Sequence, residues 1–189
     1  MRILMDEIFG ESNFLNEIIW SYQSGGRART YFPRKHDVIL FYAKSRSYYF
    51  SLKSVPIARG ETRSNHMKRS VDEDGRVYRS IISAGKEYRY YDDEPAYPGD
   101  VWDDVSHLQQ KDPERTGYDN QKPEKLLERI IRCSTQEGDL VCDLFCGSGQ
   151  LGIEALSRGA FSCVFADMDR RAADITRKNI ESCRFGEQA

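Results

Sequence analysis

The amino-terminal part of the chain carries apolar residues first at helical and then at extended spacing. Apolar side chains recur at helical spacing across 1–9, and Gly10 follows them as a helix-terminating residue. The runs 16–20 and 37–42 are short, apolar and rich in β-branched and aromatic residues, and a basic, glycine-containing stretch separates them. The pattern predicts the end of a helix and two adjacent strands joined by a long loop.

The carboxy-terminal part alternates between the two kinds of spacing. Pro123 stands at a favoured first-turn position, and apolar residues at helical spacing follow it to Cys133. Beyond it the pattern predicts a strand at 139–144, a helix at 150–158, a strand at 162–166 and a helix at 170–182 with Asp169 as its N-cap. Such a βαβα order predicts a parallel sheet with helices over its faces.

The middle of the chain, 45–105, has no regular period. Tyrosines and arginines interleave within it, as in the stretches 76–80 and 88–91. This composition predicts an insertion rather than part of the core scaffold. The chain therefore divides into an amino-terminal part of the sheet at 1–44, an insertion at 45–105 and a βαβα part at 106–189.

Composition places these elements in one modest domain. The 189 residues, 39% of them hydrophobic, can bury one core with an insertion but not two large cores. The apolar runs are far shorter than the ~20 residues of a membrane span, and the amino terminus lacks a signal-peptide cleavage site. The 5 cysteines are odd in number and lack C-x-x-C spacing. We expect a cytoplasmic protein with reduced cysteines, no membrane partner and no metal.

Charge is segregated along the chain. The net charge of -2 disfavours nucleic-acid binding, yet basic residues crowd 27–89 and acidic residues crowd 92–114. Arginines beside aromatic residues suit phosphate binding and base stacking, although they also suit an ordinary solvated surface. The basic middle is therefore a candidate for contact with double-stranded DNA, with a plain solvated surface as the alternative.

A glycine loop follows the strand predicted at 139–144. Its sequence, Asp-Leu-Phe-Cys-Gly-Ser-Gly at 143–149, places small residues where backbone can approach a ligand closely at the carboxyl end of a strand. With Gly152 it also matches the dinucleotide fingerprint, and Asp167 lies near the distance expected for an acid that binds ribose hydroxyls. The loop marks a cofactor pocket, and a NAD-dependent oxidoreductase is one interpretation.

The acid at the start of the loop favours a different cofactor. Asp143 would repel a pyrophosphate group but attract a cationic ligand. S-adenosylmethionine carries a sulfonium and an ammonium group, so carboxylates at Asp143 and Asp167 suit it better than they suit a dinucleotide. The alternative for Asp143 is a solvated acid at the end of a strand. The alternative for Asp167 is that it has no structural role and that only its neighbour Asp169, the helix cap, has one.

Two segments carry a specific combination of motifs: 114–130, with Asn-Gln-Lys-Pro at 120–123, and 138–149, with the glycine loop. The combination resembles the β-class amino-directed DNA methyltransferases, the adenine and cytosine methylases of restriction-modification systems. Further resemblance extends over 5–10, 16–20, 32–40 and 100–104. It is poorest in the middle, where this family carries its variable target-recognition segment. The resemblance implies an α/β fold with a Rossmann-like S-adenosylmethionine-dependent sheet, and methyl transfer to a flipped base, adenine-N6 more often than cytosine-N4.

The resemblance also implies roles for individual residues. Asp143 would hold the methionine end of the cofactor, and Asp167 would bind its ribose. The residues that would shape the pocket are Phe145, Gly147, Ser148 and Gly149, and those that would close it from the side are Gln121 and Lys122. The candidates for DNA contact are Arg27, Arg29, Arg34 and Lys35. A cognate restriction enzyme would be a further partner.

The family's catalytic tetrapeptide, Asp/Asn/Ser-Pro-Pro followed by an aromatic residue, is absent from the sequence. The prolines are Pro33, Pro56, Pro95, Pro98, Pro113 and Pro123, and no two are adjacent. In the family order that motif lies upstream of 5–10, together with two central strands of the sheet. The resemblance therefore implies an incomplete sheet, no catalytic residue in this chain, and a truncated form or one half of a split enzyme.

An incomplete sheet has a physical consequence. The strand that ends at Asp143 would lack a hydrogen-bonded neighbour and would expose apolar surface, so the chain alone is expected to fold poorly. The missing half would then be a separate partner chain. A DNA-binding remnant that has lost the chemistry is the remaining alternative.

Overall fold

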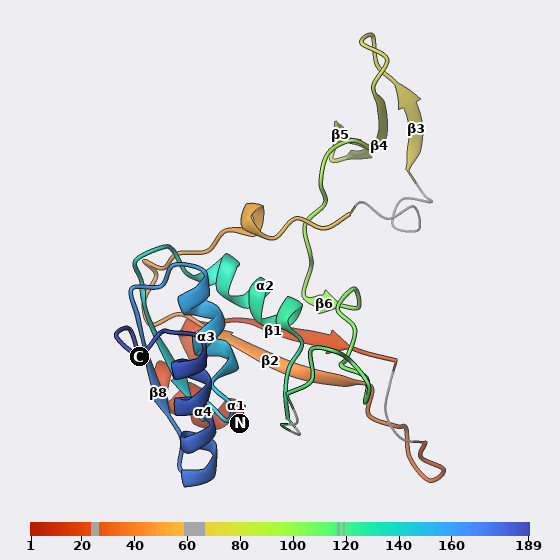
Figure 1. Ribbon diagram of the computed structural model, residues 1–189. Helices are drawn as coiled ribbons and strands as arrows, with labels where there is room; N and C mark the ends of the chain where they lie inside the picture. The colour runs from red at the N-terminus through yellow and green to blue at the C-terminus, as the bar shows by residue number, and fades with distance from the viewer. Residues whose placement is uncertain (24–26, 59–66, 117, 119) are drawn as a thin grey trace. The chain divides into compact units, whose positions relative to one another are not determined.

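The chain folds as two compact units in a computed structural model that describes residues 1–23, 27–58, 67–116, 118 and 120–189 (Figure 1). One unit contains Met1–Ser51 together with Gly99–Ala189, and the other contains Leu52–Pro98. The second unit falls inside the segment 45–105, and the first unit gathers the parts of the chain on either side of it.

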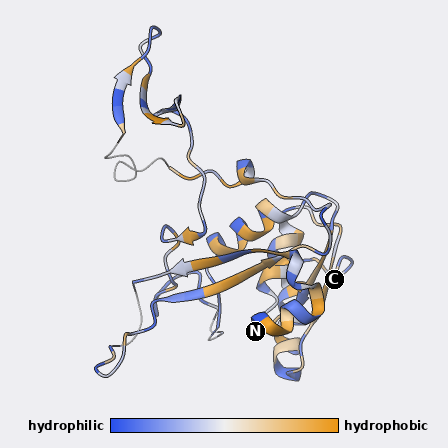
Figure 2. Ribbon diagram, turned by 180° about the vertical axis from the view of Figure 1, so that it is seen from behind, coloured by the Kyte–Doolittle hydropathy of each residue, from blue (hydrophilic) through white to orange (hydrophobic). Residues whose placement is uncertain are grey.

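The amino-terminal elements of the first unit form a sheet in the order β2–β1–β6. Helix α1 (Arg2–Phe9) precedes it and ends at Gly10, which has a φ of 90°. A 3-10 turn at Glu11–Asn13 leads into the strands β1 (Phe14–Ser21), β2 (His36–Tyr42) and β6 (Val101–Trp102). β1 pairs antiparallel with β2 and parallel with β6. The predicted helix and the two predicted strands are confirmed, and hydrophobic residues colour most of β1 and β2 (Figure 2).

Strand β6 belongs to the core sheet although it lies inside the segment predicted to be an insertion. Its two residues pair with Ile19 and Trp20, and the Ile19 N–H donates to the Asp100 carbonyl at 2.8 Å. Trp102 is 5% exposed. The core sheet therefore resumes before the predicted boundary, because a two-residue strand is too short to show the alternation that identifies longer strands.

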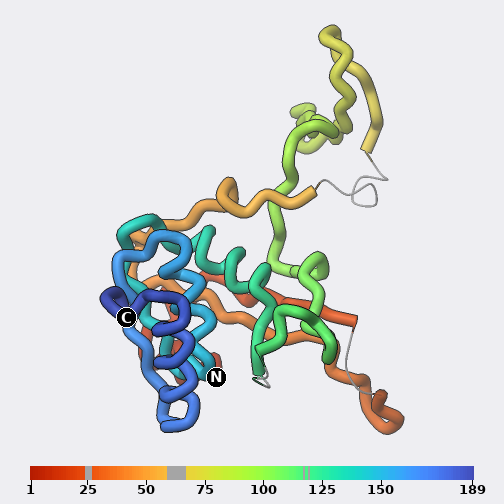
Figure 3. Tube along the Cα trace, viewed as in Figure 1, coloured from red at the N-terminus to blue at the C-terminus, as the bar shows by residue number. Residues whose placement is uncertain are grey.

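The carboxy-terminal elements have the predicted βαβα order, preceded by a helix, and Figure 3 shows the path of the chain through them. They are α2 (Glu124–Ser134), β7 (Leu140–Leu144), α3 (Gln150–Ser157), β8 (Ser162–Ala166) and α4 (Arg170–Ser182). β7 and β8 pair in parallel, as predicted. Pro123 stands just before α2 rather than inside its first turn. Asp169 caps α4 by accepting the Arg171 N–H at 2.9 Å, as predicted.

The two helices that follow the strands lie over one face of the β7–β8 pair. Phe165 of β8 stands where a Cβ on Gly152 of α3 would collide with it, and it also lines a cavity together with α4. The opposite face is open, with Leu140, Leu144 and Val164 exposed by 68%, 61% and 52%. Within the described residues, β8 is the only strand paired with β7. This exposed edge agrees with the expectation from the sequence, and poor folding of the chain alone stays a prediction.

Helix α2 joins two clusters of buried side chains. One cluster contains Ile131 of α2 with Ala155, Leu156, Ala160 and Cys163, and the other contains Leu126 of α2 with Trp20, Trp102 and Val105. Arg129, between these two positions, is 5% exposed and donates from Nη1 to Asp104 Oδ1 at 2.8 Å. Because Asp104 follows β6, α2 ties the β7–β8 pair to the β2–β1–β6 sheet.

The second unit contains an antiparallel sheet where the pattern predicts irregular structure. After a 3-10 turn at Leu52–Ser54, the strands β3 (Lys68–Val71), β4 (Val77–Ser83) and β5 (Lys86–Tyr91) pair in the order β3–β4–β5. Ala84 and Gly85, with φ of 49° and 76°, connect the last two strands in a two-residue turn. The alternation is hidden in the sequence because tyrosines and arginines occur on both faces of this sheet.

None of the helices in the described ranges is long and apolar enough to cross a membrane. Across the same residues, no group of His, Cys, Asp or Glu side chains could hold a metal ion. The cysteines, Cys133, Cys142, Cys146, Cys163 and Cys183, are free thiols.

Candidate cofactor site

The loop between β7 and α3 uses left-handed backbone at several positions. Phe145, Gly147 and Gly149 have φ of 62°, 57° and 76°. A phenylalanine in this region is uncommon, because its Cβ crowds the backbone. The side chain of Phe145 is 78% exposed at the surface of the loop. These tight turns allow α3 to begin directly after Gly149.

Helix α4 holds the loop through the loop's carbonyl groups. Thr176 Oγ1 donates to the Gly147 carbonyl and Asn179 Nδ2 donates to the Ser148 carbonyl, both at 2.9 Å. Thr176 is buried, so its hydroxyl replaces water as the partner of that carbonyl. The sequence pattern does not indicate a role for these two residues. The one feature of the sequence that could have indicated them is the presence of polar residues on the helix face that also buries Ile180.

Asp167 ties the end of β8 to the glycine loop. Its Oδ2 accepts the N–H of Gly147 at 2.8 Å, and its Oδ1 accepts the N–H of Asp169 at 2.9 Å. These backbone hydrogen bonds, the one from Asp169 more than the one from Gly147, hold the pKa of Asp167 below its ordinary value. Asp167 therefore has a structural role beside that of the cap Asp169.

Asp143 lies beneath the loop, near the end of β7. Its side chain is 5% exposed, and Oδ2 accepts the N–H of Gly152 in the first turn of α3 at 3.1 Å. Burial raises the pKa of this carboxyl; the hydrogen bond from Gly152 opposes that effect, and the negative charge of Asp167 adds to it. The burial contradicts the alternative of a solvated strand-end acid.

Two glycines of the loop and helix are required by packing. A Cβ on Gly149 would lie 2.7 Å from Cγ2 of Thr176, and one on Gly152 would lie 2.5 Å from Sγ of Cys163. Gly152 lets α3 approach β8 closely, which is the role of the third glycine in the dinucleotide fingerprint. That match therefore has an explanation in packing that involves no pyrophosphate.

The two residues predicted to close the pocket from the side make other contacts. Gln121 is buried, with Nε2 donating to the Glu114 carbonyl at 2.6 Å and Oε1 accepting the Thr116 N–H at 2.7 Å. Lys122 Nζ donates to Asp37 Oδ2 at 2.8 Å. Gln121 thus stabilises its own segment, and Lys122 ties that segment to strand β2.

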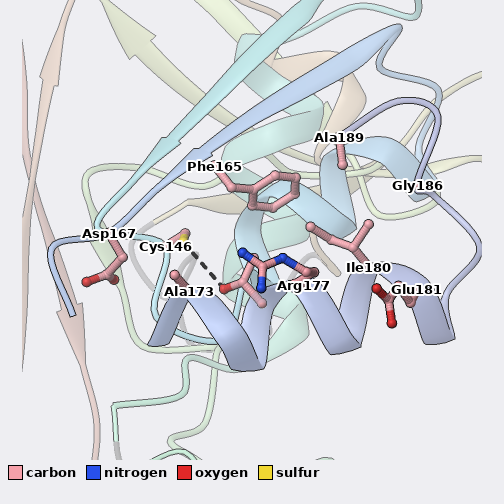
Figure 4. A pocket seen from close by; sticks show the side chains of 10 residues that line it. Cys146, Phe165, Asp167, Ala173, Arg177, Ile180, Glu181, Gly186 and Ala189 are labelled. Atoms are coloured by element: carbon pink, nitrogen blue, oxygen red, sulfur yellow. Dashed lines mark hydrogen bonds between the residues drawn. The ribbon is translucent and has the colours of Figure 1, made fainter. Parts of the chain in front are cut away.

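A cavity of about 360 Å³ lies between β8, α4 and the residues after α4 (Figure 4). It is lined by Cys146, Phe165, Asp167, Ala173, Thr176, Arg177, Ile180, Glu181, Gly186 and Ala189. Asp167 is the only predicted cofactor residue in this lining. The cavity therefore lies on the α4 side of the loop and does not include Gly147, Ser148 or Gly149.

The basic candidates for DNA contact lie on the segment between β1 and β2. Arg27, Arg29 and Arg34 are exposed. Lys35 is half-buried, and its Nζ donates to the Gln23 carbonyl at 3.2 Å. The neighbouring residues 24–26 lie outside the described part of the chain. This segment belongs to the same compact unit as the glycine loop.

A parallel strand pair, a glycine loop and acids at the strand ends are typical of α/β proteins that bind a nucleoside cofactor. A family model described as DNA methylase matches residues 1–178. The chain belongs to this family of N6/N4 DNA methyltransferases. The resemblance inferred from the sequence is confirmed, and the family match favours a methyltransferase over a NAD-dependent oxidoreductase.

Two relatives and one solved structure describe the similarity further. Type II methyltransferase M.HpaI of Haemophilus parainfluenzae is 28% identical over 172 residues, which are 90% of this chain and 44% of the relative. DNA adenine methyltransferase YhdJ of Escherichia coli (strain K12) is 30% identical over 148 residues, 76% of this chain and 45% of the relative. The structure of PvuII DNA methyltransferase (cytosine-N4-specific) matches with a TM-score of 0.54 and 13% identity, covering 95% of this chain and 61% of that one. The structural match shows the α/β fold, and the chain spans less than half the length of both relatives.

Proposed function

We propose that the chain carries the cofactor-binding and DNA-recognition parts of a site-specific DNA methyltransferase that uses S-adenosylmethionine. The observation that carries this proposal is the buried carboxylate of Asp143 beneath a left-handed glycine loop, whose Gly147 N–H is bound by Asp167. Family membership supports the reaction class, because the matched relatives are named as DNA methyltransferases.

The residues of the site fit S-adenosylmethionine in charge. Asp143 and Asp167 place two carboxylates at the carboxyl ends of adjacent parallel strands, where cationic groups are attracted and phosphate groups are repelled. In the proposed site Asp143 holds the methionine end, Asp167 holds the ribose, and Phe145 with Gly147 and Gly149 shapes the pocket. The bound cofactor supplies the methyl group, and these residues bind and orient it.

The second unit, Leu52–Pro98, is the proposed target-recognition segment of an incomplete Rossmann-like domain. Strand register places Arg69, Arg79 and Tyr90 side by side across its three strands. Arg79 is paired with Asp92 at 3.2 Å, so acids of the same unit offset part of its basic charge. Recognition would therefore use exposed aromatic rings as well as cations.

The segment between β1 and β2 is the proposed contact to the DNA backbone. Arg27, Arg29 and Arg34 are exposed there, and arginines that neutralise phosphates give binding that weakens with salt. We propose adenine-N6 as the methyl acceptor on the basis of the family's more frequent target. YhdJ is named as an adenine enzyme and the PvuII enzyme as cytosine-N4-specific.

Methyl transfer also needs groups that hold the flipped base, and the family's tetrapeptide for this has no counterpart in the sequence. We therefore propose that this chain binds cofactor and DNA and that a second polypeptide segment supplies the tetrapeptide. Among the described residues β7 has one unpaired edge, and this edge with the exposed face beside it, which includes Leu140 and Leu144, would accept a further parallel strand with its covering helix.

The test measures cofactor binding, DNA binding and transfer of a labelled methyl group to unmethylated DNA. The proposal predicts that the folded fraction of the chain alone binds both partners without transfer, and that transfer appears on co-expression with a segment carrying Asp-Pro-Pro-Tyr and its strand. Salt-dependent DNA binding without cofactor binding would instead identify a DNA-binding remnant. Methyl transfer by the chain alone would contradict the need for a second segment.

A further inference from the structure

The side chain of Tyr118 covers the glycine loop at Gly147. A Cβ built on Gly147 would lie 2.7 Å from the Tyr118 hydroxyl oxygen, 2.8 Å from Cζ and 2.9 Å from Cε1. Any side chain at position 147 would therefore collide with the phenol, in addition to the strain of a φ of 57°. The glycine makes room for a tyrosine from a distant part of the sequence.

Hydrogen bonds among described residues on either side of Tyr118 hold its backbone. The Tyr118 carbonyl accepts the backbone N–H of Gln121 at 3.2 Å. The buried amide of Gln121 in turn bonds the backbone of Glu114 and Thr116. These bonds fix Gln121, which precedes α2 and its N-cap Pro123, and through it the carbonyl of Tyr118. The role of Gln121 is therefore to position the segment rather than to contact a ligand.

The loop directs its polar groups away from Tyr118. The N–H of Gly147 is bound by Asp167, and its carbonyl is bound by Thr176 of α4. The Cα of Gly147 is left facing the phenol of Tyr118. An aromatic ring at this position covers the loop with an apolar surface, and its electron-rich face attracts cations such as a sulfonium.

We propose that Tyr118 is a wall of the S-adenosylmethionine site and that Gly147 is a glycine because this ring rests on it. The inference depends on the proposed cofactor site. It adds a binding residue to those that the resemblance implies: Tyr118 lies shortly before Gln121 in the sequence but far from Gly147, which its ring contacts. It also gives the segment with Gln121 and Lys122 a role in the site: its hydrogen bonds position Tyr118, and Tyr118 contacts the cofactor.

The test is a double-mutant cycle on cofactor affinity with Tyr118→Ala, Gly147→Ala and the double variant. Tyr118→Ala is expected to weaken S-adenosylmethionine binding by about tenfold, whereas Tyr118→Phe, which keeps the ring, retains most of the affinity. Backbone strain from Gly147→Ala is the same in both backgrounds, but the collision with the phenol exists only when Tyr118 is present. We therefore expect the loss of affinity in the double variant to be about tenfold smaller than the product of the two single losses.

Two controls keep the outcomes separate. Tyr31→Ala removes a 71% exposed tyrosine of the same unit and should leave cofactor affinity unchanged. Thermal unfolding without cofactor reports whether each variant folds, and Tyr118→Leu replaces Tyr118→Ala if the latter does not. If the wild type binds the cofactor but Tyr118→Ala binds it equally tightly, Tyr118 has no role in the site. The same conclusion follows if the loss in the double variant equals the product of the two single losses. Either result leaves the proposed function standing. Absence of binding by a wild-type chain that shows cooperative thermal unfolding would overturn the proposed function itself, and this inference with it.

Discussion

Asp167 accepts the backbone N–H of Gly147 at 2.8 Å, so the acid that follows β8 holds the loop that follows β7. Removing this carboxylate frees the loop and leaves its N–H without a partner. Asp167→Ala is therefore expected to weaken S-adenosylmethionine binding by about tenfold, measured by calorimetry. Asp167→Asn keeps one acceptor oxygen and should give an intermediate loss. Asp174→Ala, which removes an exposed acid of α4, is the matched control; equal affinity in all three variants would contradict the role of Asp167.

Asp143 gives a prediction that separates binding from stability. Because burial raises its pKa above the ordinary 3.8, the folded protein binds a proton here more readily than the unfolded chain does. This group therefore adds to the free energy of unfolding as the pH falls from neutral through the raised pKa, and that contribution is lost as the pH rises again. Asp143→Asn should lack this pH dependence and be at least as stable as the wild type at neutral pH.

The same substitution should weaken S-adenosylmethionine binding, because the amide keeps the hydrogen bond from Gly152 but loses the negative charge. The measurements are denaturant unfolding across the acidic range and cofactor affinity at neutral pH. A variant that loses stability at neutral pH, or that binds the cofactor as tightly as the wild type, would contradict the role of Asp143 as a buried counter-charge.

Asp104 and Arg129 give a prediction about stability alone. The Arg129 hydrogen bond lowers the pKa of Asp104, and Arg129 itself is 5% exposed. Asp104→Asn leaves that buried guanidinium without a counter-charge and is expected to lower the free energy of unfolding by about 3 kcal/mol. In the exposed pair Arg177–Asp174, Asp174→Asn should change it by less than about 1 kcal/mol. Equal effects of the two substitutions would show that burial of Arg129 does not govern the cost.

Thr176→Val tests the support of the loop from α4. Valine has nearly the shape of threonine but no hydroxyl. The Gly147 carbonyl therefore loses the hydrogen bond that Thr176 donates. The expected cost is about 1–3 kcal/mol in the free energy of unfolding, together with weaker cofactor binding. Thr176→Ser keeps the donor and is the matched control. If valine and serine behave alike in chemical denaturation, the hydrogen bond does not stabilise the loop.

Local patterns predicted the elements of the first unit because each leaves a signal within a few residues. Gly10 ends α1, Asp169 caps α4, and the loop at 143–149 connects β7 to α3. β6 escaped detection because two residues carry no period. The sheet of the second unit escaped because its arginines and tyrosines do not alternate with apolar residues.

The residues around the glycine loop were only partly predictable. Asp143 lies next to the last residue of β7, and Asp167 directly follows β8, so the sequence places both acids at one edge of the sheet. The contacts of Tyr118, Thr176 and Asn179 with the loop depend on how distant segments pack, and no local pattern encodes them. The same holds for the side chain of Gln121, which bonds its own segment.

Titration of the wild-type chain with S-adenosylmethionine at neutral pH, in parallel with NAD and with the Asp143→Asn variant, shows whether the loop above Asp143 binds this cofactor. We expect saturable binding of S-adenosylmethionine by the wild type, weaker binding by the variant, and no binding of NAD. Binding of NAD without S-adenosylmethionine, or equal S-adenosylmethionine affinity in wild type and variant, would contradict the assignment of the loop above Asp143 as the cofactor site.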